Sequence, residues 1–377
     1  MSIDARPSRR PSRRSGRGSL VPDWAAARAL AGLRVCAWIA AASCGDDSTA
    51  SSPDSGSPEL DLGEPEPTDA RAADLGPPED GGSPAPGPER FLDPARYDCR
   101  ARGPFEPPSR PYSPGCHRTL SCDVPLVLTD RAGTRLAPEN TLAAARAAIL
   151  LGVDIIGVDV RLTSDGALMA LHDAEVDRTT DGSGSIASMT IAEVKDLAIV
   201  ADPGDPEGDW SCERVPTLDE LFAITRGRIV VGLHAPSDTT PDLDALLAHY
   251  VVDNDLGDDA FVYCYDPGRC NAVRTAQPFV PVVARAYFGF RLGTGDLALT
   301  PAPLAIEVEA TDEASAILPG IRALGAKSFV VAFLAADAPA TLVGDYDGYD
   351  RLLADGVGGL LTREPHLLLR ALGRLEE

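Results

Sequence analysis

Three common binding patterns are missing from this chain of 377 residues. No GxGxxG or GxxxxGK loop follows any predicted strand, so nothing supports nucleotide binding. No two of the six cysteines from Cys99 onward show C-x2-C spacing beside suitable histidines, which argues against a zinc site of that kind. No basic stripe in the second half of the chain offsets the formal charge of −23, from 57 acidic against 34 basic residues. That charge disfavours nucleic acid and anionic membranes as partners held by electrostatics.

The N-terminal apolar run is also short. The run LAGLRVCAWIAAAS before Cys44 falls below the roughly 20 apolar residues that a membrane-spanning helix needs. It suits the apolar core of a cleaved signal, and Cys44 follows Ala41-Ala42-Ser43 as in a bacterial lipoprotein processing site whose usual Leu is Ala. We expect residues 1–43 to be a targeting segment and Cys44 to be lipidated, on an exported, membrane-anchored protein in the periplasm or at the cell surface. An ordinary cleaved signal with an incidental cysteine is the alternative.

Composition changes after this cysteine. Residues 45–98 are rich in Pro, Gly and Ser and hold fourteen acidic residues and three arginines, a net charge of 3 − 14 = −11. Such a segment cannot bury enough apolar area to offset its ordering entropy. We therefore expect residues 44–98 to be a lipidated cysteine with a disordered tether, and residues 99–377 to form the folded domain.

Six cysteines remain in that domain, and an even number in an exported chain indicates disulfides. Six cysteines allow 15 pairings, which sequence cannot resolve. We expect one close pair, Cys264–Cys270. The full set is Cys99, Cys116, Cys122, Cys212, Cys264 and Cys270.

Strands and helices alternate through this domain. Apolar, β-branched runs predict strands at 124–130, 155–162, 167–173, 228–235, 260–266, 279–286, 304–310, 327–335 and 356–362. Helical patterns fall between most of them, notably at 140–151, 217–225, 243–251, 313–324 and 365–375. Near-continuous apolar strands separated by helices predict a parallel sheet covered by helices. Eight or nine such strands favour an α/β fold of the closed TIM (β/α)8 type.

The densest pattern runs from Leu126 to Gly182 and reads LVLTDRAGTRLAPENTLAAARAAILLGVDIIGVDVRLTSDGALMALHDAEVDRTTDG. It resembles the glycerophosphodiester phosphodiesterase family, whose pattern is an HRG-type turn, APENT, a strand with E-x-D, LTxDGxLVxxHD and DRTTxG. The ending GVGGLLTREPHLLLRAL resembles the family's GVDGIITDxPxxLL. The likeness extends from about Val124 to Leu372 and implies a TIM barrel.

The resemblance also implies roles for single residues. The family's first histidine, its general base, falls at Asp130, while Arg131 keeps the phosphate-contacting arginine. The E-x-D pair that supplies two metal ligands reads Gly157-Val158-Asp159, so Asp159 is the retained ligand. The second histidine, an acid or base, is retained as His172.

A later family strand, I-E-x-K, supplies a third carboxylate and a lysine. Its two positions align with Gly232 and His234, and the glycine of the first turn aligns with Ala132. One carboxylate does not hold the Mg²⁺ or Ca²⁺ that the family uses, because these ions need several oxygen ligands. We therefore expect hydrolysis to be lost or weak, with a mouth that binds a small phosphodiester or other anion.

An active phosphodiester hydrolase with a remodelled site is the alternative. Two Asp and two His side chains at strand ends can hold Zn²⁺ or another first-row metal. Those residues would be Asp130, Asp159, His172 and His234. Glu307 and Glu309 share one face of their strand and either add a carboxylate from across the barrel or face water. His172 has its own structural explanation as a hydrogen-bonded core histidine.

Overall fold

The computed structural model describes residues 93–101, 115–286, 301–310 and 314–375. Eight parallel strands form a closed ring, because β1 pairs with both β2 and β9. The predicted TIM barrel is confirmed. The strands of the ring are β1 (Leu126–Thr129), β2 (Ile155–Leu162), β4 (Val230–His234), β5 (Ala260–Cys264), β6 (Val282–Ala286), β7 (Ala305–Glu309), β8 (Lys327–Val331) and β9 (Gly359–Thr362).

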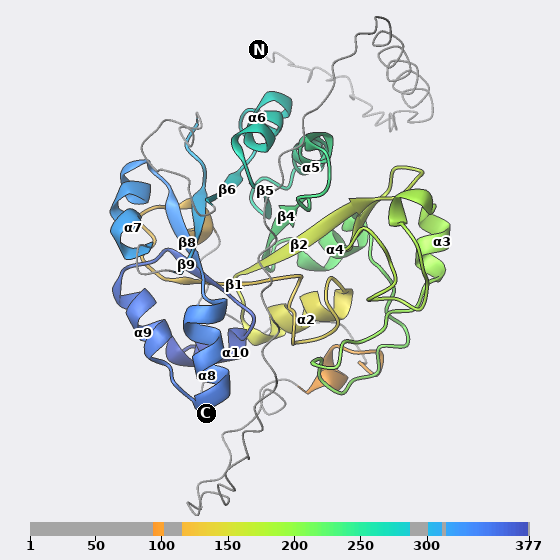
Figure 1. Cartoon of the computed structure of the whole chain (residues 1–377), viewed down its shortest axis with the longest axis horizontal. Coiled ribbons are helices and arrows are strands. Elements are labelled where there is room, and N and C mark those ends of the chain that lie inside the picture. Colours follow the sequence, from red (N-terminus) through yellow and green to blue (C-terminus); the bar gives the residue numbers. More distant parts are fainter. Residues whose placement is uncertain (1–92, 102–114, 287–300, 311–313, 376–377) are drawn as a thin grey trace, which may run out of the picture. The chain divides into compact units, whose positions relative to one another are not determined.

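Helices surround the ring of strands (Figure 1). Their ends carry the expected capping chemistry: Thr217 and Glu220 form a capping box, and Pro241 opens its helix. The α-helices are α2 (Leu142–Leu151), α3 (Ile191–Asp196), α4 (Leu218–Thr225), α5 (Pro241–Asp253), α6 (Pro267–Ala276), α7 (Ala314–Ala323), α8 (Ala338–Val343), α9 (Asp347–Ala354) and α10 (Pro365–Ala371). Shorter elements are η2 (Pro94–Arg96), η3 (Cys116–Arg118), η4 (Ile186–Ser188), the π-helix η5 (Phe333–Asp337) and strand β3 (Leu168–Ala170), antiparallel to β2. No helix in the described ranges is long and apolar enough to cross a membrane.

The interior of the barrel is filled by alternate residues of the strands, as the period of two requires. Leu128, Ile155, Val230, Phe261 and Tyr263 belong to one buried cluster inside the ring. The register of β2 against β4 continues this inward-facing set toward the carboxyl ends of the strands, pairing residue 157 with 232 and residue 159 with 234. The two positions of the family's E-x-D pair therefore both face the barrel interior.

Three disulfides are present in the described residues. The predicted Cys264–Cys270 bridge is confirmed, and it ties the end of β5 to α6. Cys99–Cys212 and Cys116–Cys122 are the other two.

Tyr97, at the end of the predicted tether, is buried and donates a hydrogen bond from its hydroxyl to the Leu136 carbonyl, 2.9 Å away. The packed structure thus begins slightly before Cys99. The predicted targeting segment, Cys44 and the tether up to residue 92 lie outside the described residues.

Candidate functional site

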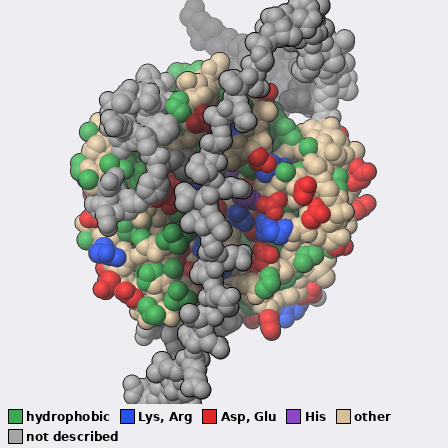
Figure 2. Space-filling model, in the orientation of Figure 1, with side chains coloured by type: hydrophobic (Ala, Val, Ile, Leu, Met, Phe, Trp, Pro, Cys, Tyr) green, Lys and Arg blue, Asp and Glu red, His purple; other side chains and the backbone are tan. Residues whose placement is uncertain are grey.

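A polar cavity of about 430 Å³ lies at the carboxyl ends of the strands, where TIM barrels carry their active sites. It is lined by Asp159, Arg161, His172, Asp173, Ala174, Pro236, Ser237, Asp238, Tyr265 and Arg285. Histidine, basic and acidic side chains gather near the centre of the face shown in Figure 2. The described part of the protein has further cavities, including one of about 570 Å³ at the opposite end, lined by the start of β8.

His172 is oriented by its neighbour in the chain. Its Nδ1 lies 2.6 Å from Asp173 Oδ1, and Arg178 Nε donates to the other oxygen of that carboxylate at 2.7 Å. Although burial acts to raise it, the hydrogen bonds from Arg178 and His172 lower the pKa of Asp173 to about 2. The dyad leaves Nε2 of His172 as the ring nitrogen available to a ligand in the cavity.

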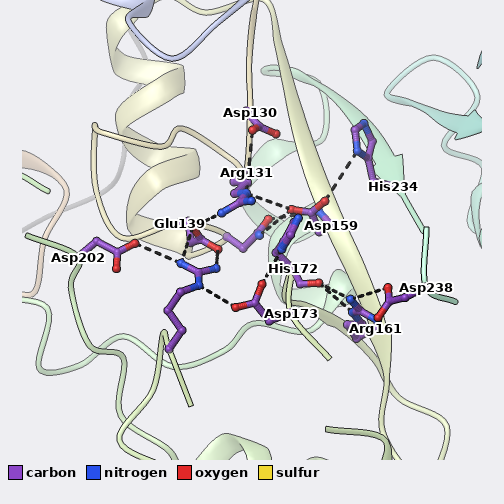
Figure 3. A network of polar contacts seen from close by, with 12 residues as sticks. Asp130, Arg131, Glu139, Asp159, Arg161, His172, Asp173, Asp202, His234 and Asp238 are labelled. Carbon is purple, nitrogen blue, oxygen red and sulfur yellow. Dashed lines mark hydrogen bonds and ion pairs between the residues drawn. The ribbon is translucent and has the colours of Figure 1, made fainter. Parts of the chain in front are cut away.

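The Arg131 side chain forms an ion pair with the Glu139 carboxylate and does not line the cavity (Figure 3). Its Nη1 donates to Glu139 Oε2 at 2.7 Å, and Arg178 Nη2 donates to the other Glu139 oxygen at 2.6 Å. Arg131 and Ala132 have φ of 48° and 63°, in the left-handed region that suits the glycine of the family's turn. The turn therefore keeps its shape although Ala132 replaces that glycine.

Asp159 is almost fully buried beside these groups. Asn140 Nδ2 donates to its Oδ2 at 3.1 Å, and Arg131 Nε lies 4.0 Å from the same oxygen. Burial, and next the Asp130 carboxylate, raise the pKa of Asp159 to about 6. Asp130 itself faces two guanidinium groups, with Arg363 Nη2 at 3.7 Å and Arg131 Nε at 4.0 Å.

His234 is also buried and lies next to Asp159 (Figure 3). Its Nδ1 is 3.7 Å from Asp159 Oδ1 and 2.7 Å from the Tyr265 hydroxyl. Burial, then the charges of Arg285 and His172, lower the pKa of His234 well below its ordinary value, so the ring is neutral at neutral pH. Its Nε2 has no hydrogen-bond partner among the described residues.

The two glycines at the ligand positions differ in what surrounds them. A Cβ at Gly157 would meet only Thr129 O at 3.6 Å and His234 Nε2 at 3.9 Å, which are ordinary contacts. A Cβ at Gly232 would lie 2.6 Å from the ring of Tyr263 and 2.7 Å from that of Phe261. The place of the third family carboxylate is therefore filled by two aromatic rings.

A buried ion pair lies in the same layer of the barrel. Glu307 has no exposed side-chain surface, and Arg285 Nε lies 2.8 Å from its Oε1. Arg285 Nη2 is 3.8 Å from Glu309 Oε1, so the same guanidinium faces both carboxylates. Glu307 thus neither faces water nor stands free to complete a metal site, and burial raises its pKa.

The four residues of the remodelled-site hypothesis surround one end of the barrel but do not form a metal-binding group. Among the residues described, no set of three or more His, Cys, Asp or Glu side chains is placed to hold a metal ion.

The sequence motifs did not indicate a role at the site for Arg178, Tyr263 or Arg285. Only the aromatic alternation of Phe261, Tyr263 and Tyr265, at period two, could have indicated that rings fill the mouth beside β5.

The closed ring of strands and its surrounding helices define a (β/α)8 barrel, with a polar cavity at the carboxyl ends of the strands. Residues 117–286 match the model of the Glycerophosphoryl diester phosphodiesterase family. The chain is 44% identical over 100 residues to a glycerophosphodiester phosphodiesterase of Caldanaerobacter subterraneus subsp. tengcongensis, covering 26% of this chain and 40% of that protein. It is 40% identical over 96 residues to human glycerophosphodiester phosphodiesterase 1, covering 26% and 29%. The chain therefore carries a domain of the glycerophosphoryl diester phosphodiesterase family.

Solved structures agree on the fold. A glycerophosphoryl diester phosphodiesterase from Parabacteroides distasonis matches with a TM-score of 0.56 and 19% identity, over 70% of this chain and 91% of that one. A phosphodiesterase of Oleispira antarctica, in complex with the product sn-glycerol-3-phosphate, matches with a TM-score of 0.55 and 20% identity, over 67% and 99%. The sequence matches to the Caldanaerobacter and human proteins cover only 40% and 29% of the lengths of those proteins.

Proposed function

We propose that this barrel binds a small glycerophosphodiester, or the phosphomonoester sn-glycerol 3-phosphate, and has lost the family's metal-dependent hydrolysis. The main observation in support of lost hydrolysis is that no side chain fits at Gly232, the position of the family's third carboxylate. The rings of Tyr263 and Phe261 occupy the space that a side chain there would need. With Gly157 also lacking a side chain, Asp159 remains as the one carboxylate of the family's three, too few for a hard divalent cation.

Groups that can donate to a phosphate still line the cavity. Arg161 and Arg285 are two of them, although Arg161 already donates to Asp238 and to the His172 carbonyl, and Arg285 already pairs with Glu307. His172 is the third, and its contact with Asp173 through Nδ1 leaves Nε2 for a ligand. Charge-assisted hydrogen bonds from such groups to phosphate oxygens are the strong ones. Asp159 opposes an anion while ionised, and its pKa of about 6 means that this repulsion weakens under mildly acidic conditions.

Calorimetric titration of the full-length protein with sn-glycerol 3-phosphate and with glycerophosphocholine tests the proposal. We expect both ligands to bind in EDTA, with affinities that are unchanged by Mg²⁺ or Ca²⁺. Glycerophosphocholine, whose phosphodiester does not titrate near neutral pH, should bind more strongly as the pH falls from 7 through about 6. His172→Ala should weaken binding about tenfold or more, since a hydrogen bond to a charged group contributes roughly 1.5–3 kcal/mol. His249→Ala, on the exposed surface of α5, is the matched control. Absence of binding, or binding that requires the metal, would refute the proposal.

The active hydrolase with an Asp and His metal site is the second candidate function. Proximity of His234 Nδ1 to Asp159, at 3.7 Å, is the observation in its favour. That nitrogen already pairs with the Tyr265 hydroxyl at 2.7 Å, which makes it unsuitable as a ligand unless the hydroxyl moves away. Zn²⁺-dependent turnover lost in both His234→Ala and Asp159→Ala would favour this candidate over the binding protein.

We also propose that the protein is exported and anchored by a lipidated Cys44. The apolar run and small residues before this cysteine, followed by an acidic Pro- and Gly-rich segment, support the proposal. One acyl chain binds membranes only marginally, whereas several chains anchor stably. Cys44→Ala should move the protein from the membrane fraction to the soluble fraction. Membrane association that survives this substitution would contradict a lipid anchor at Cys44.

A further inference from the structure

The cavity of about 570 Å³ at the amino ends of the strands lies at the opposite end of the barrel from the polar cavity. It is bounded by α7, by the start of β8 and by the segment that connects α9 to β9, and Figure 1 shows α7 next to β8. Leu318, Leu353 and Val357 give it an apolar wall. This end of a TIM barrel ordinarily contributes to stability rather than to binding, so charged groups in its lining need an explanation of their own.

A buried lysine lines this cavity. Lys327, the first residue of β8, is 6% exposed and lies on the same side of the strand as Phe329, which faces the barrel interior. Its Nζ donates to the Cys122 carbonyl at 2.9 Å, and within the described part of the chain this ammonium forms no ion pair with a carboxylate. Lysine is almost never buried without such a partner. Burial lowers the pKa of Lys327, which means that the charged form is costly at this position.

The hydrogen bond to Cys122 explains only part of this arrangement. It connects β8 to the loop that the Cys116–Cys122 bridge closes, and it uses one of the three donors of the ammonium. An uncharged donor would make the same connection without the free-energy cost of burying a charge. The positive charge at this position therefore favours an anionic partner.

A second cation lines the same cavity. Arg322 is exposed in the last turn of α7, where a positive charge also suits the helix dipole, and its guanidinium forms no ion pair with any described residue. Asp123 and Asp355 line the cavity too, and the charge of Asp123 partly offsets the effect of burial on the pKa of Lys327. Both acidic residues are exposed, so water and salt screen their charges more than that of the buried ammonium. The cations therefore dominate the field that a ligand meets inside the cavity.

We infer that this cavity is a second binding site, for a small organic carboxylate with an apolar tail. The carboxylate accepts hydrogen bonds from Lys327 and Arg322, and the tail packs against the apolar wall. A concave, partly apolar cavity with a few polar groups is typical of small-molecule sites, and charge-assisted hydrogen bonds are the strong ones. The inference goes beyond the proposed function, because the two cavities share no lining residue.

Two ligands of nearly the same shape test the inference by calorimetric titration of the full-length protein. Isocaproate carries the carboxylate, and isocaproamide is its uncharged counterpart. We expect isocaproate to bind about tenfold or more tightly than the amide, and Lys327→Met to remove this difference, because the ammonium makes the charge-assisted hydrogen bond. Arg322→Gln should weaken isocaproate binding by about threefold, as for an exposed ion pair, and it keeps the test valid if circular dichroism shows that Lys327→Met is unfolded. Arg228→Gln, exposed just before β4 at the same end of the barrel, is the matched control and should change neither affinity.

Three results would overturn the inference. Equal affinities for isocaproate and isocaproamide would show an apolar cavity that does not recognise the anion. Acetate or inorganic phosphate that binds as tightly as isocaproate would show that the apolar wall recognises no tail. The absence of saturable isocaproate binding at millimolar concentrations would leave the cavity without a ligand of this class. Glycerophosphocholine should bind equally to the wild type, Lys327→Met and Arg322→Gln, so failure here leaves the proposed function standing.

Discussion

Alanine substitutions at the two facing glycines of β2 and β4 should have opposite effects on stability. Gly157 and Gly232 are partners in the parallel register and both face the barrel interior, so they differ mainly in their neighbours. The Cβ of Gly232→Ala would lie 2.6 Å from the Tyr263 ring, against the 3.4 Å at which ordinary contacts begin. The rings would have to move by about 3.4 − 2.6 = 0.8 Å.

These rings have little room to move. Phe261 is fully buried and Tyr263 nearly so, and the two rings already pack edge to face with centroids 5.0 Å apart. Overpacking of this kind costs about 1–3 kcal/mol. Gly157→Ala meets only ordinary contacts, and loss of a glycine from the unfolded chain stabilises by about 0.4–1 kcal/mol. The two variants should therefore differ by roughly 1.5–4 kcal/mol in the free energy of unfolding.

Urea unfolding followed by circular dichroism measures this difference directly, with the slope of the transition checked against the wild type. A lower midpoint for Gly232→Ala and an unchanged or higher midpoint for Gly157→Ala are the expected results. Equal stabilities would mean that the position of the third family carboxylate is open. The claim that aromatic rings have replaced a metal ligand would then be wrong.

Three further predictions concern charge and cross-links. Asp159→Asn should stabilise the protein by about 2–3 kcal/mol at pH 7 and not at all below pH 4. The pKa of Asp159 is raised from 3.8 to about 6 in the folded protein, so ionisation of this carboxyl opposes folding as the pH rises between these values. A gain in stability that persists at pH 4 in thermal unfolding would contradict this. Replacing Cys99 and Cys212 by serine should cost about 2.6 kcal/mol more than replacing Cys116 and Cys122, since the bridges span 113 and 6 residues and the loop entropy grows with the logarithm of this span. Equal losses in denaturant titrations would refute the loop argument. Arg178→Gln should raise the pKa of Asp173, because the substitution removes the 2.7 Å hydrogen bond from Arg178 Nε to the Asp173 carboxylate. Chemical-shift titration measures this pKa. Arg228→Gln, at an exposed position near β4, should leave the pKa of Asp173 unchanged.

The strands of the barrel could be predicted because each is buried on both sides. All nine predicted runs contain a strand, and β2 has the predicted ends, Ile155 and Leu162. Helices were recognised where an apolar face repeats, as in α2. Helix α6 was missed because its sequence PGRCNAVRTA is mostly polar, although Asp266 caps it and Pro267 opens it.

The site could be predicted only in part. Motif spacing located Arg131, Asp159 and His172 at one end of the barrel, because these residues lie near strands identified from the sequence. The Arg285–Glu307 ion pair depends on the register of β6 against β7, which brings these residues opposite each other. Sequence alone does not give a parallel register between strands that are separated by a long connection.

Turnover of glycerophosphocholine and bis-p-nitrophenyl phosphate by the full-length protein tests the central claim most directly. The assay is run in Ca²⁺, Mg²⁺, Mn²⁺ and Zn²⁺ beside His172→Ala, with circular dichroism to show that both proteins are folded. Loss of the metal site predicts no turnover above that of the variant in any metal. Metal-dependent turnover that disappears in His172→Ala would contradict the account and establish an active phosphodiesterase with a remodelled site.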